Sequence, residues 1–318
     1  MRIGVLTSGG DAPGMNAVIR SVVRSGIYNN HRIYGIYDGY EGLIDGNVQE
    51  LQVSSVADII HKGGTFLRTS RSERFLTEEG RKKALNMIHW QGLEALIVIG
   101  GDGSGKGALE LQKKGVAVAL IPATIDNDLG FSDYTIGFMT AVENIADAIA
   151  KIRDTSGSHG RANVIEVMGR HCGDLALYAG LSGGAESTII PERSYDLDEI
   201  ADKIERGKVR GKRHHIIALA EGVGNAYEIA KAIEEKTGVD TKVSILGYIQ
   251  RGGTPSSFDR VLAAKMGAAA VERLARGEGK IAIATVNGEV KALDLESALN
   301  TPKVIDEKLY KLVEELSI

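Results

Sequence analysis

The sequence has little of what marks an exported or membrane-bound protein. It contains one cysteine, Cys172, in 318 residues, so no internal disulfide framework can form, which is typical of proteins in a reducing compartment. No apolar run approaches the roughly 20 residues that a membrane-spanning helix requires. The apolar run that follows Met1 is also too short for a signal peptide. We therefore expect a cytoplasmic protein with no membrane partner.

Proline and net charge are scarce as well. With only five prolines, the chain has no proline-rich linker and no low-complexity tract. Its 42 acidic and 38 basic residues leave a net charge of −4, which gives no reason to expect a nucleic-acid partner. Hydrophobic residues at 43% and charged residues at 25% are typical of a folded globular protein. What the sequence has in excess is glycine, with 40 residues.

Short apolar runs alternate with helical patterns along the whole chain. Such near-continuous apolar strands predict parallel sheets with helices on both faces. The expected strands are Arg2–Thr7, Arg32–Tyr37, Leu93–Ile99, Val116–Ile121, Asn163–Met168, His215–Ala220 and Val243–Leu246. The expected helices are Glu78–Trp90, Ser104–Lys114, Thr140–Arg153, Asp196–Arg210, Tyr227–Thr237 and Phe258–Arg276. The pattern predicts an α/β protein with two doubly wound, mostly parallel-sheet domains.

Two further local signals bear on the fold. Lys280–Asp294 reads as a β-hairpin, with Asn287-Gly288 as its two-residue turn. Trp90 ends a helical pattern and is expected in the core, and Cys172 is expected to be a packing residue. The composition changes only weakly near Thr135–Met139, so the sequence itself does not locate the domain boundary.

Two glycine-rich loops follow expected strands. Ser8-Gly9-Gly10-Asp11-Ala12-Pro13-Gly14 precedes a helix that begins near Met15, and Gly100-Gly101-Asp102-Gly103-Ser104 precedes another. Bare backbone amides and a helix N-terminus attract phosphate, and Asp102 is a hard oxygen ligand suited to phosphate-bound Mg²⁺. Neither loop has the Walker A pattern. The alternative reading is a tight strand-to-helix turn in the first case and a polar surface loop in the second.

A third loop carries a hydroxyl and two carboxylates. In an extended segment, Thr124, Asp126 and Asp128 would face one side, which suits a general base beside a metal-associated acid. The alternative is a cluster of Asx turns. Arginines beside glycines, Arg170 and Arg251, follow two more strands and could grip anions. Together these features indicate phosphoryl transfer, which depends on positioning and on charge stabilisation.

These motifs, in this order, give the chain a family resemblance. It resembles the bacterial ATP-dependent 6-phosphofructokinases from Ile3 nearly to its last residue. The motifs that carry the resemblance are Gly9 to Asn16, Gly100 to Ser104, Thr124 to Asp128, Met168-Gly169-Arg170, Ala220-Glu221-Gly222 and Gln250 to Gly253. The resemblance implies an allosterically regulated kinase that phosphorylates fructose 6-phosphate at the 1-hydroxyl, the committed step of glycolysis.

The resemblance also implies roles for individual residues. Asp126 would be the general base, aided by Thr124, Asp128, Arg71 and Arg170, and Asp102 would hold Mg²⁺. The expected ATP-binding residues are Gly10, Arg71, Ser72, Gly101, Asp102, Gly103 and Ser104. The expected sugar-binding residues are Thr124, Ile125, Asp126, Arg161, Met168, Gly169, Arg170, Glu221, Lys242, Tyr248, Ile249, Gln250 and Arg251. Of these, Arg161 and Lys242 would come from the neighbouring subunit of a homotetramer.

Domain bounds and an effector site follow from the same resemblance. Residues 1–137 plus about 250–300 would form the ATP-binding domain, and about 138–249 plus 301–318 the substrate-binding domain, with the active site in the cleft between them. ADP or phosphoenolpyruvate would bind as effector. The residues implied for this are Arg20, Ser21, Val22, Val23, Arg24, Arg153, Gly184, Ala185, Glu186, Arg210, Lys212, Arg213 and His214. Without the rest of the set, Arg20 and Arg24 would read as a solvated basic stripe.

Some positions depart from the family pattern. Lys242 replaces an arginine and Tyr248 replaces a histidine near the expected 6-phosphate site, and Val53 stands near a missing effector arginine. Gly103 stands where pyrophosphate-dependent relatives carry an aspartate, so ATP is the expected donor. The sugar's identity and the strength of the effector response stay open. The alternatives are a kinase of another phosphosugar, such as tagatose 6-phosphate, and a weakly active regulatory paralogue.

Overall fold

The computed structural model describes residues 1–317 as two compact α/β units. The first unit comprises residues 1–125, 129–140 and 251–303, and the second comprises 126–128, 141–250 and 304–317. Residue 318, which the expected substrate-binding domain includes, lies outside the described residues. The chain passes between the units more than once, so each unit is built from segments that are distant in the sequence.

The first unit is built on a seven-stranded sheet with the order β11-β10-β5-β4-β1-β2-β3. Its inner strands are parallel, and only the edge strands β3 and β11 pair in the antiparallel sense. The strands are β1 (Arg2–Thr7), β2 (Arg32–Ile36), β3 (Val48–Leu51), β4 (Ala95–Gly100), β5 (Ala117–Pro122), β10 (Lys280–Val286) and β11 (Glu289–Asp294). Strand β4 is buried at every residue, as expected where helices cover both faces of a sheet.

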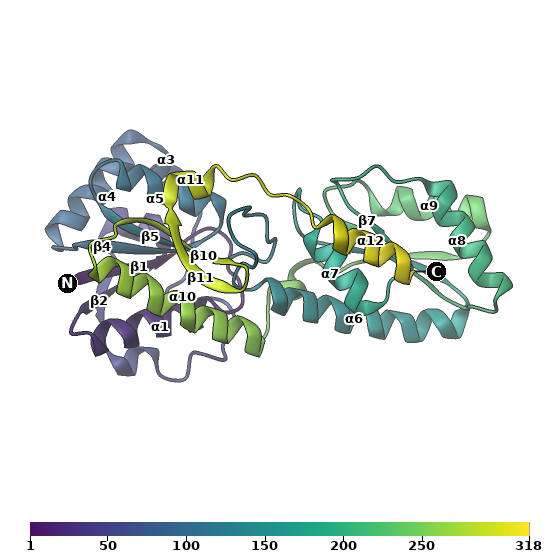
Figure 1. Cartoon of the computed structure of the whole chain (residues 1–318), viewed down its shortest axis with the longest axis horizontal. Helices are drawn as coiled ribbons and strands as arrows, with labels where there is room; N and C mark the ends of the chain where they lie inside the picture. Colours follow the sequence, from purple (N-terminus) through teal and green to yellow (C-terminus); the bar gives the residue numbers. More distant parts are fainter. Residues whose placement is uncertain (318) are drawn as a thin grey trace. The chain divides into compact units, whose positions relative to one another are not determined.

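Helices cover both faces of this sheet (Figure 1). One layer contains α1 and α10, which pack against each other, and the other contains α4, α5 and α11. The helices and 3₁₀ turn of this unit are α1 (Met15–Tyr28), α2 (Gly39–Asp45), η1 (Val53–Val56), α3 (Glu73–Leu76), α4 (Glu78–Trp90), α5 (Asp102–Gln112), α10 (Ser257–Ala275) and α11 (Leu295–Leu299). The start of α6 (Phe138–His159) also belongs to this unit, and the rest of that helix belongs to the second.

The second unit is built on a four-stranded parallel sheet with the order β7-β8-β6-β9. Its strands are β6 (Ala162–Val167), β7 (Ser187–Ile189), β8 (His215–Ala220) and β9 (Thr241–Ile245). Its helices, besides most of α6, are α7 (Asp174–Gly183), α8 (Leu197–Val209), η2 (Gly247–Gln250), α9 (Ala226–Thr237) and α12 (Glu307–Leu316). Apolar side chains of α8 and α9 form one core with the sheet. Helix α7 packs against β7 and β8, and α12 packs against α7.

The local sequence signals are confirmed in most places. The hairpin forms, and its turn residues Asn287 and Gly288 both have positive φ, at 55° and 76°, as a type I′ turn requires. Trp90 is an exception, because its side chain is 78% exposed and the expectation of a core residue is wrong. Trp90 is the last residue of α4 and lies off the face on which its buried residues recur every four positions, Gly80, Ala84 and Ile88. Along residues 1–317, no helix is both long and apolar enough to cross a membrane.

One buried carboxylate ties α10 to the start of α6. The Asp259 side chain is fully buried and accepts hydrogen bonds from the Gly137 and Thr140 N–H groups at 2.9 and 2.8 Å. It also accepts from the hydroxyls of Thr140 and Ser256. The carboxylate thus satisfies donors that have no access to water, which makes it a structural anchor of the first unit.

We expect Asp259→Asn to lower the free energy of unfolding by about 3 kcal/mol, because the amide NH₂ would face a buried donor and leave it unsatisfied. Urea denaturation followed by circular dichroism measures this change. The matched control is Asp294→Asn, since Asp294 caps α11 at the surface through the Ser297 N–H and its loss should cost about 1 kcal/mol or less. Equal losses in the two variants would contradict an anchoring role.

Candidate active site

The glycine loops of the first unit lie at the switch point of its sheet. Strand β1 pairs with β2 on one side and with β4 on the other, so the chain reverses its direction of winding between β1 and β4. Ligands of doubly wound sheets bind at the carboxyl ends of strands at such a point. The loops after β1 and β4 meet there, because the Ser8 N–H donates to Ile99 O at 3.0 Å and Ser104 Oγ donates to Ser8 O at 2.9 Å.

The second glycine loop is closely packed at Gly100 but open at Gly103. A Cβ on Gly100 would lie 2.6 Å from Ser8 O and 2.5 Å from Ser104 Oγ, so no larger residue fits. The backbone of Ser104 is also fixed by Tyr40, whose buried hydroxyl donates to Ser104 O at 2.7 Å. A Cβ on Gly103 would meet nothing within 4 Å. Space is therefore open at the first turn of α5, and the N–H groups of a helix N-terminus favour an anionic ligand.

Asp102, the expected metal ligand, begins α5 and is partly exposed. Its Oδ2 lies 2.7 Å from Nζ of Lys106 one helical turn later. Among residues 1–317, no three His, Cys, Asp or Glu side chains come together as a protein-only metal site. A single exposed carboxylate beside a phosphate-binding loop fits Mg²⁺, which binds through one or two carboxylates together with substrate phosphates.

Arg71 and Ser72 lie on the segment beside the first loop. Thr69 Oγ1 donates to Gly9 O at 2.9 Å and Ser70 Oγ donates to Asp38 O at 2.7 Å, so this segment is attached to the loops after β1 and β2. Ser72 caps α3 by accepting from the Phe75 N–H and its hydroxyl donates to Glu41. The Arg71 side chain is exposed.

Arg251 also belongs to the first unit and lies against the first loop. Its Nη2 is 2.9 Å from Asp11 Oδ1 and 3.0 Å from Asp11 O. A Cβ on Gly10 would lie 2.3 Å from that same nitrogen, so Gly10 gives the guanidinium room to cross the loop. Arg251 and Gly10, expected in the sugar and nucleotide sites, are therefore neighbours.

The segment from Thr124 to Asp128 differs from expectation. Asn127 has a φ of 50°, in the left-handed region, so the segment turns and the prediction that alternate residues share one face is wrong. The turn is held by the Asn127 amide, which donates to Asp174 Oδ2 at 2.8 Å. Asp126 is 6% exposed and Asn127 is 1% exposed. The buried amide makes a local turn more stable than an extended chain.

In the second unit, Asp126 faces an arginine. Its Oδ2 lies 3.3 Å from Nε of Arg170, and the backbone N–H of Arg170 donates to Glu221 Oε1 at 2.8 Å. Gly169 and Arg170, in the loop between β6 and α7, have φ values of 127° and 55°. A Cβ on Gly222 would lie 2.1 Å from Arg170 O. The motifs after β6 and β8 thus join Asp126 in one cluster.

Further contacts complete this carboxyl edge of the second sheet. The Gln250 carboxamide accepts from the Met168 N–H at 3.0 Å and donates to Gly247 O at 3.0 Å, so it holds the β6 loop and η2 together. Burial, and then the charge of Glu221, raise the pKa of Glu166. The Cys172 side chain is buried, as expected of a packing residue, and its Sγ lies 3.9 Å from Asn127 O. Tyr248 and Ile249, also expected in the sugar site, are mostly exposed.

Two expected sugar-phosphate residues lie elsewhere in the same unit. Arg161 precedes β6 and Lys242 is the second residue of β9, whereas Met168, Arg170 and Glu221 follow the opposite ends of strands. A six-residue strand spans about 20 Å. Arg161 and Lys242 therefore cannot reach the Asp126–Arg170–Glu221 cluster of their own chain, and both instead pair with Asp240, which no sequence motif indicated.

The expected effector residues of the second unit gather around Glu186. This carboxylate is 5% exposed, with Lys212 Nζ at 2.7 Å and His214 Nε2 at 3.5 Å from Oε1. Burial acts to raise the pKa of Glu186, but the hydrogen bonds from Lys212 and from the Ile216 N–H outweigh it and hold the pKa below its usual value. Arg153 donates to Gly184 O at 2.6 Å nearby.

The other expected effector residues range from exposed to fully buried. On α1, Arg24 is exposed and Arg20 is half-buried, whereas Val22 and Val23 are fully buried and belong to the core. Ser21 Oγ donates to Ala264 O of α10. Arg213 reaches Ser158 O at 3.4 Å, Arg210 caps α8 and is exposed, and Ala185 is buried.

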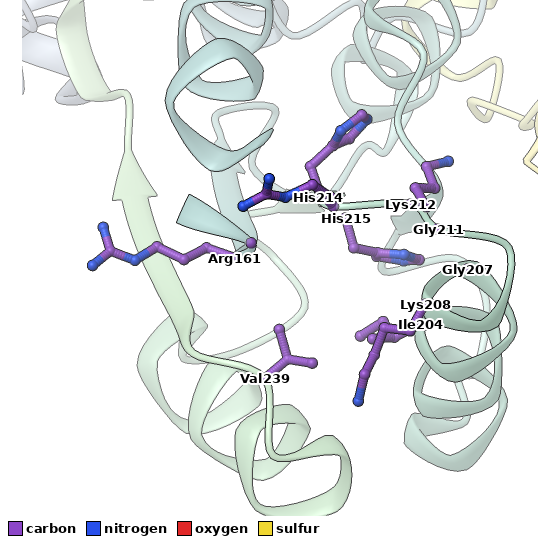
Figure 2. Close-up of a pocket in the computed structure, with 11 residues that line it drawn as sticks. Arg161, Ile204, Gly207, Lys208, Gly211, Lys212, His214, His215 and Val239 are labelled. Carbon is purple, nitrogen blue, oxygen red and sulfur yellow. The ribbon is translucent and has the colours of Figure 1, made fainter. Parts of the chain in front are cut away.

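A cavity of about 290 Å³ opens beside these residues, between Arg161, Val239 and the end of α8. Figure 2 shows that its cationic groups do not converge, because Arg161 extends away from the other labelled side chains and Lys208 and Lys212 point in different directions. Lys208 is paired with Glu205 and Lys212 with Glu186. Burial lowers the pKa of His215 to about 4, so that ring is neutral at pH 7. The groups of one chain alone therefore do not enclose an anion in this cavity.

Comparison with known proteins places the chain in a family. The phosphofructokinase family model matches residues 2–274. The chain is 58% identical over 316 residues to the ATP-dependent 6-phosphofructokinase of Alkaliphilus metalliredigens, with 99% of each covered, and 53% identical over 317 residues to that of Bacillus subtilis, with 100% of this chain and 99% of the other covered. The solved structure of phosphofructokinase from Saccharomyces cerevisiae superposes with a TM-score of 0.87 at 34% identity, covering 99% of this chain and 47% of that one. The chain therefore belongs to the phosphofructokinase family.

Proposed function

We propose that the chain is an ATP-dependent 6-phosphofructokinase, a glycolytic transferase that moves the γ-phosphoryl group of ATP to the 1-hydroxyl of fructose 6-phosphate. The observation that carries the proposal is the buried Asp126 carboxylate, 3.3 Å from Arg170 and in one cluster with Glu221. It stands in a chain whose relatives at 53–58% identity are ATP-dependent 6-phosphofructokinases.

Each member of the cluster has a distinct task in this reaction. Asp126 accepts the proton of the attacking 1-hydroxyl, because a carboxylate positioned within reach of a hydroxyl serves as a general base. Arg170 and Arg71 offset the negative charge of the transferring phosphoryl group. Glu221 and Met168 bind the sugar, and Thr124 orients the hydroxyl. Asp128 supports the metal region.

The nucleotide binds along the loops of the first unit. Gly10, Gly101, Gly103 and Ser104 supply backbone N–H groups, with Arg71 and Ser72 beside them. Asp102 holds Mg²⁺, which when bound neutralises charge on the phosphate oxygens. Lys106 Nζ lies 2.7 Å from the same carboxylate and would share it with the metal. The open space at Gly103 admits the α-phosphate of ATP.

The sugar 6-phosphate requires a second copy of the chain. Arg161 and Lys242 lie at the amino edge of the four-stranded sheet, opposite Arg170 and Glu221, so they serve the site of a neighbour. Arg251 of the chain itself completes the phosphate grip, with Tyr248, Ile249 and Gln250 beside it. We therefore propose a homotetramer as the working form, since a symmetric contact between two copies completes two sites at once.

Regulation and location form a separate part of the proposal. ADP or phosphoenolpyruvate binds at Glu186, Lys212 and His214, with Arg20 and Arg24 supplied by another copy. We assign nucleotide binding to residues 1–137 plus about 250–300 and sugar binding to about 138–249 plus 301–318. Because ATP and sugar phosphates are metabolites of the cytoplasm, we place the protein there.

The test is a coupled assay of the purified protein with fructose 6-phosphate, Mg²⁺ and either ATP or pyrophosphate. We expect turnover with ATP and none with pyrophosphate, because Gly103 leaves room for the nucleotide. Tagatose 6-phosphate is assayed in parallel, since Lys242 and Tyr248 bear on sugar selection. Faster turnover of tagatose 6-phosphate, or no turnover with any donor, would overturn the proposal.

A further inference from the structure

One carboxylate, Asp240, is shared by the two cations assigned to the sugar 6-phosphate. Its Oδ2 lies 2.7 Å from Nε of Arg161, and its Oδ1 lies 2.6 Å from Nζ of Lys242. Each carboxylate oxygen thus takes one cation, which is the arrangement that two oxygens of a phosphate group would make with the same pair.

The backbone fixes this arrangement. Strands β6 and β9 are parallel neighbours, with Ala162 opposite Thr241, and the Ala162 N–H donates to Asp240 O at 3.1 Å. The residues just before the two strands, Arg161 and Asp240, are therefore side by side. Figure 2 shows Arg161 extending across the strand that continues from Val239, away from the neighbouring cavity. The guanidinium pairs with the Asp240 carboxylate instead of a group in the cavity.

The three side chains remain accessible to a ligand. Exposed fractions are 37% for Arg161, 41% for Asp240 and 53% for Lys242, so a phosphate can approach without any unfolding. The hydrogen bond from Lys242, and after it the one from Arg161, hold the pKa of Asp240 below its usual value. Asp240 therefore carries a full negative charge throughout the neutral range.

We propose that Asp240 is a built-in competitor of the sugar 6-phosphate, an intramolecular anion that occupies Arg161 and Lys242 and weakens the binding of fructose 6-phosphate to the neighbouring copy. This inference rests on the proposed function. An arriving phosphate dianion must share the two cations with the Asp240 carboxylate or displace it. Its attraction to Arg161 and Lys242 is then partly offset by its repulsion from the negative charge of Asp240. Asp240 touches neither the phosphoryl group nor the nucleotide, so it affects the affinity of the sugar and not the transfer step.

The experiment compares the full-length Asp240→Asn enzyme with the unaltered one in steady-state kinetics. Asparagine keeps the shape and one acceptor oxygen but removes the charge. We expect KM for fructose 6-phosphate to fall about five- to thirty-fold, the range given by removing a unit charge about 4 Å from a phosphate that carries one or two negative charges in watery surroundings. We expect kcat and KM for ATP to stay the same. The inhibition constant of inorganic phosphate against the sugar should fall in parallel, which a merely structural change would not produce.

Two further variants separate the possible failures. Asp198→Asn is the matched control, because Asp198 is an exposed aspartate of the same unit that pairs with Lys236, and it should leave every constant unchanged. Arg161→Gln should raise KM for fructose 6-phosphate. If Arg161→Gln has no effect on that KM, the assigned phosphate site is wrong and this inference is overturned with it. If Arg161→Gln raises KM but Asp240→Asn leaves it unchanged or raises it, only the competition is refuted.

Discussion

Replacing Asp126 with serine should lower kcat by about a thousand-fold or more, because a positioned general base contributes about 10²–10⁴-fold to such a proton transfer. Serine is smaller and cannot accept the proton near neutral pH. The substitution also removes the negative charge that lies 3.3 Å from Arg170 Nε, so the guanidinium loses its ion-pair partner. The coupled assay with ATP and fructose 6-phosphate measures the loss, and KM for the sugar should change far less than kcat.

The control for this result must rule out unfolding. Asp154→Ser removes an exposed aspartate from α6 of the same unit and should leave kcat intact. Circular dichroism and the urea midpoint of Asp126→Ser should match those of the unaltered protein, since the turn around Asp126 is held by Asn127 and Asp174. A folded Asp126→Ser enzyme that keeps a tenth of its kcat would show that another group takes the proton.

Gly103→Asp should lower kcat/KM for ATP by about 5- to 1000-fold, the range spanned by a like charge about 4 Å from a phosphate at water-like and at protein-surface dielectric constants. The fold should tolerate the change, because a Cβ at Gly103 meets nothing within 4 Å and aspartate is favourable in the first turn of a helix. KM for fructose 6-phosphate should not change. Steady-state kinetics with ATP as the varied substrate gives the answer.

Gly103→Ala separates charge from volume in the same position. Alanine adds the Cβ without the carboxylate and favours the helix, so this variant should stay close to the unaltered enzyme. If alanine lowers kcat/KM as much as aspartate does, the effect is steric. If neither does, the nucleotide phosphates do not approach α5 at this residue.

Much of the fold was predictable because its strands are buried on both faces. Such strands are continuous apolar runs, and β8 was expected at His215–Ala220 and is found there. Helix α4 likewise has its expected bounds, Glu78–Trp90, because Thr77 caps it and charged residues line one side. Short edge elements such as β3 and β7 carry too few residues for any period to be visible, and they form because a neighbouring strand is present.

The candidate site was predictable where it consists of loops that follow strands. Those loops converge for reasons of sheet topology, which a sequence with alternating strands and helices already implies. The turn at Asn127 could not be predicted from the sequence, because it depends on the buried contact with Asp174, 47 residues away. The counter-ion Asp240 was missed for a similar reason, since only the pairing of β6 with β9 brings it to Arg161.

The opposite placement of the two sugar-binding groups on one sheet has a genetic consequence. Under the proposed assembly, a chain with a damaged amino edge keeps its own base and its own nucleotide loops intact but impairs the site of its neighbour. A chain that lacks the base impairs only itself. In a cell that makes both kinds of chain, a mixed pair would contain one fully intact site and one site with both defects, so two inactive alleles could together restore part of the activity.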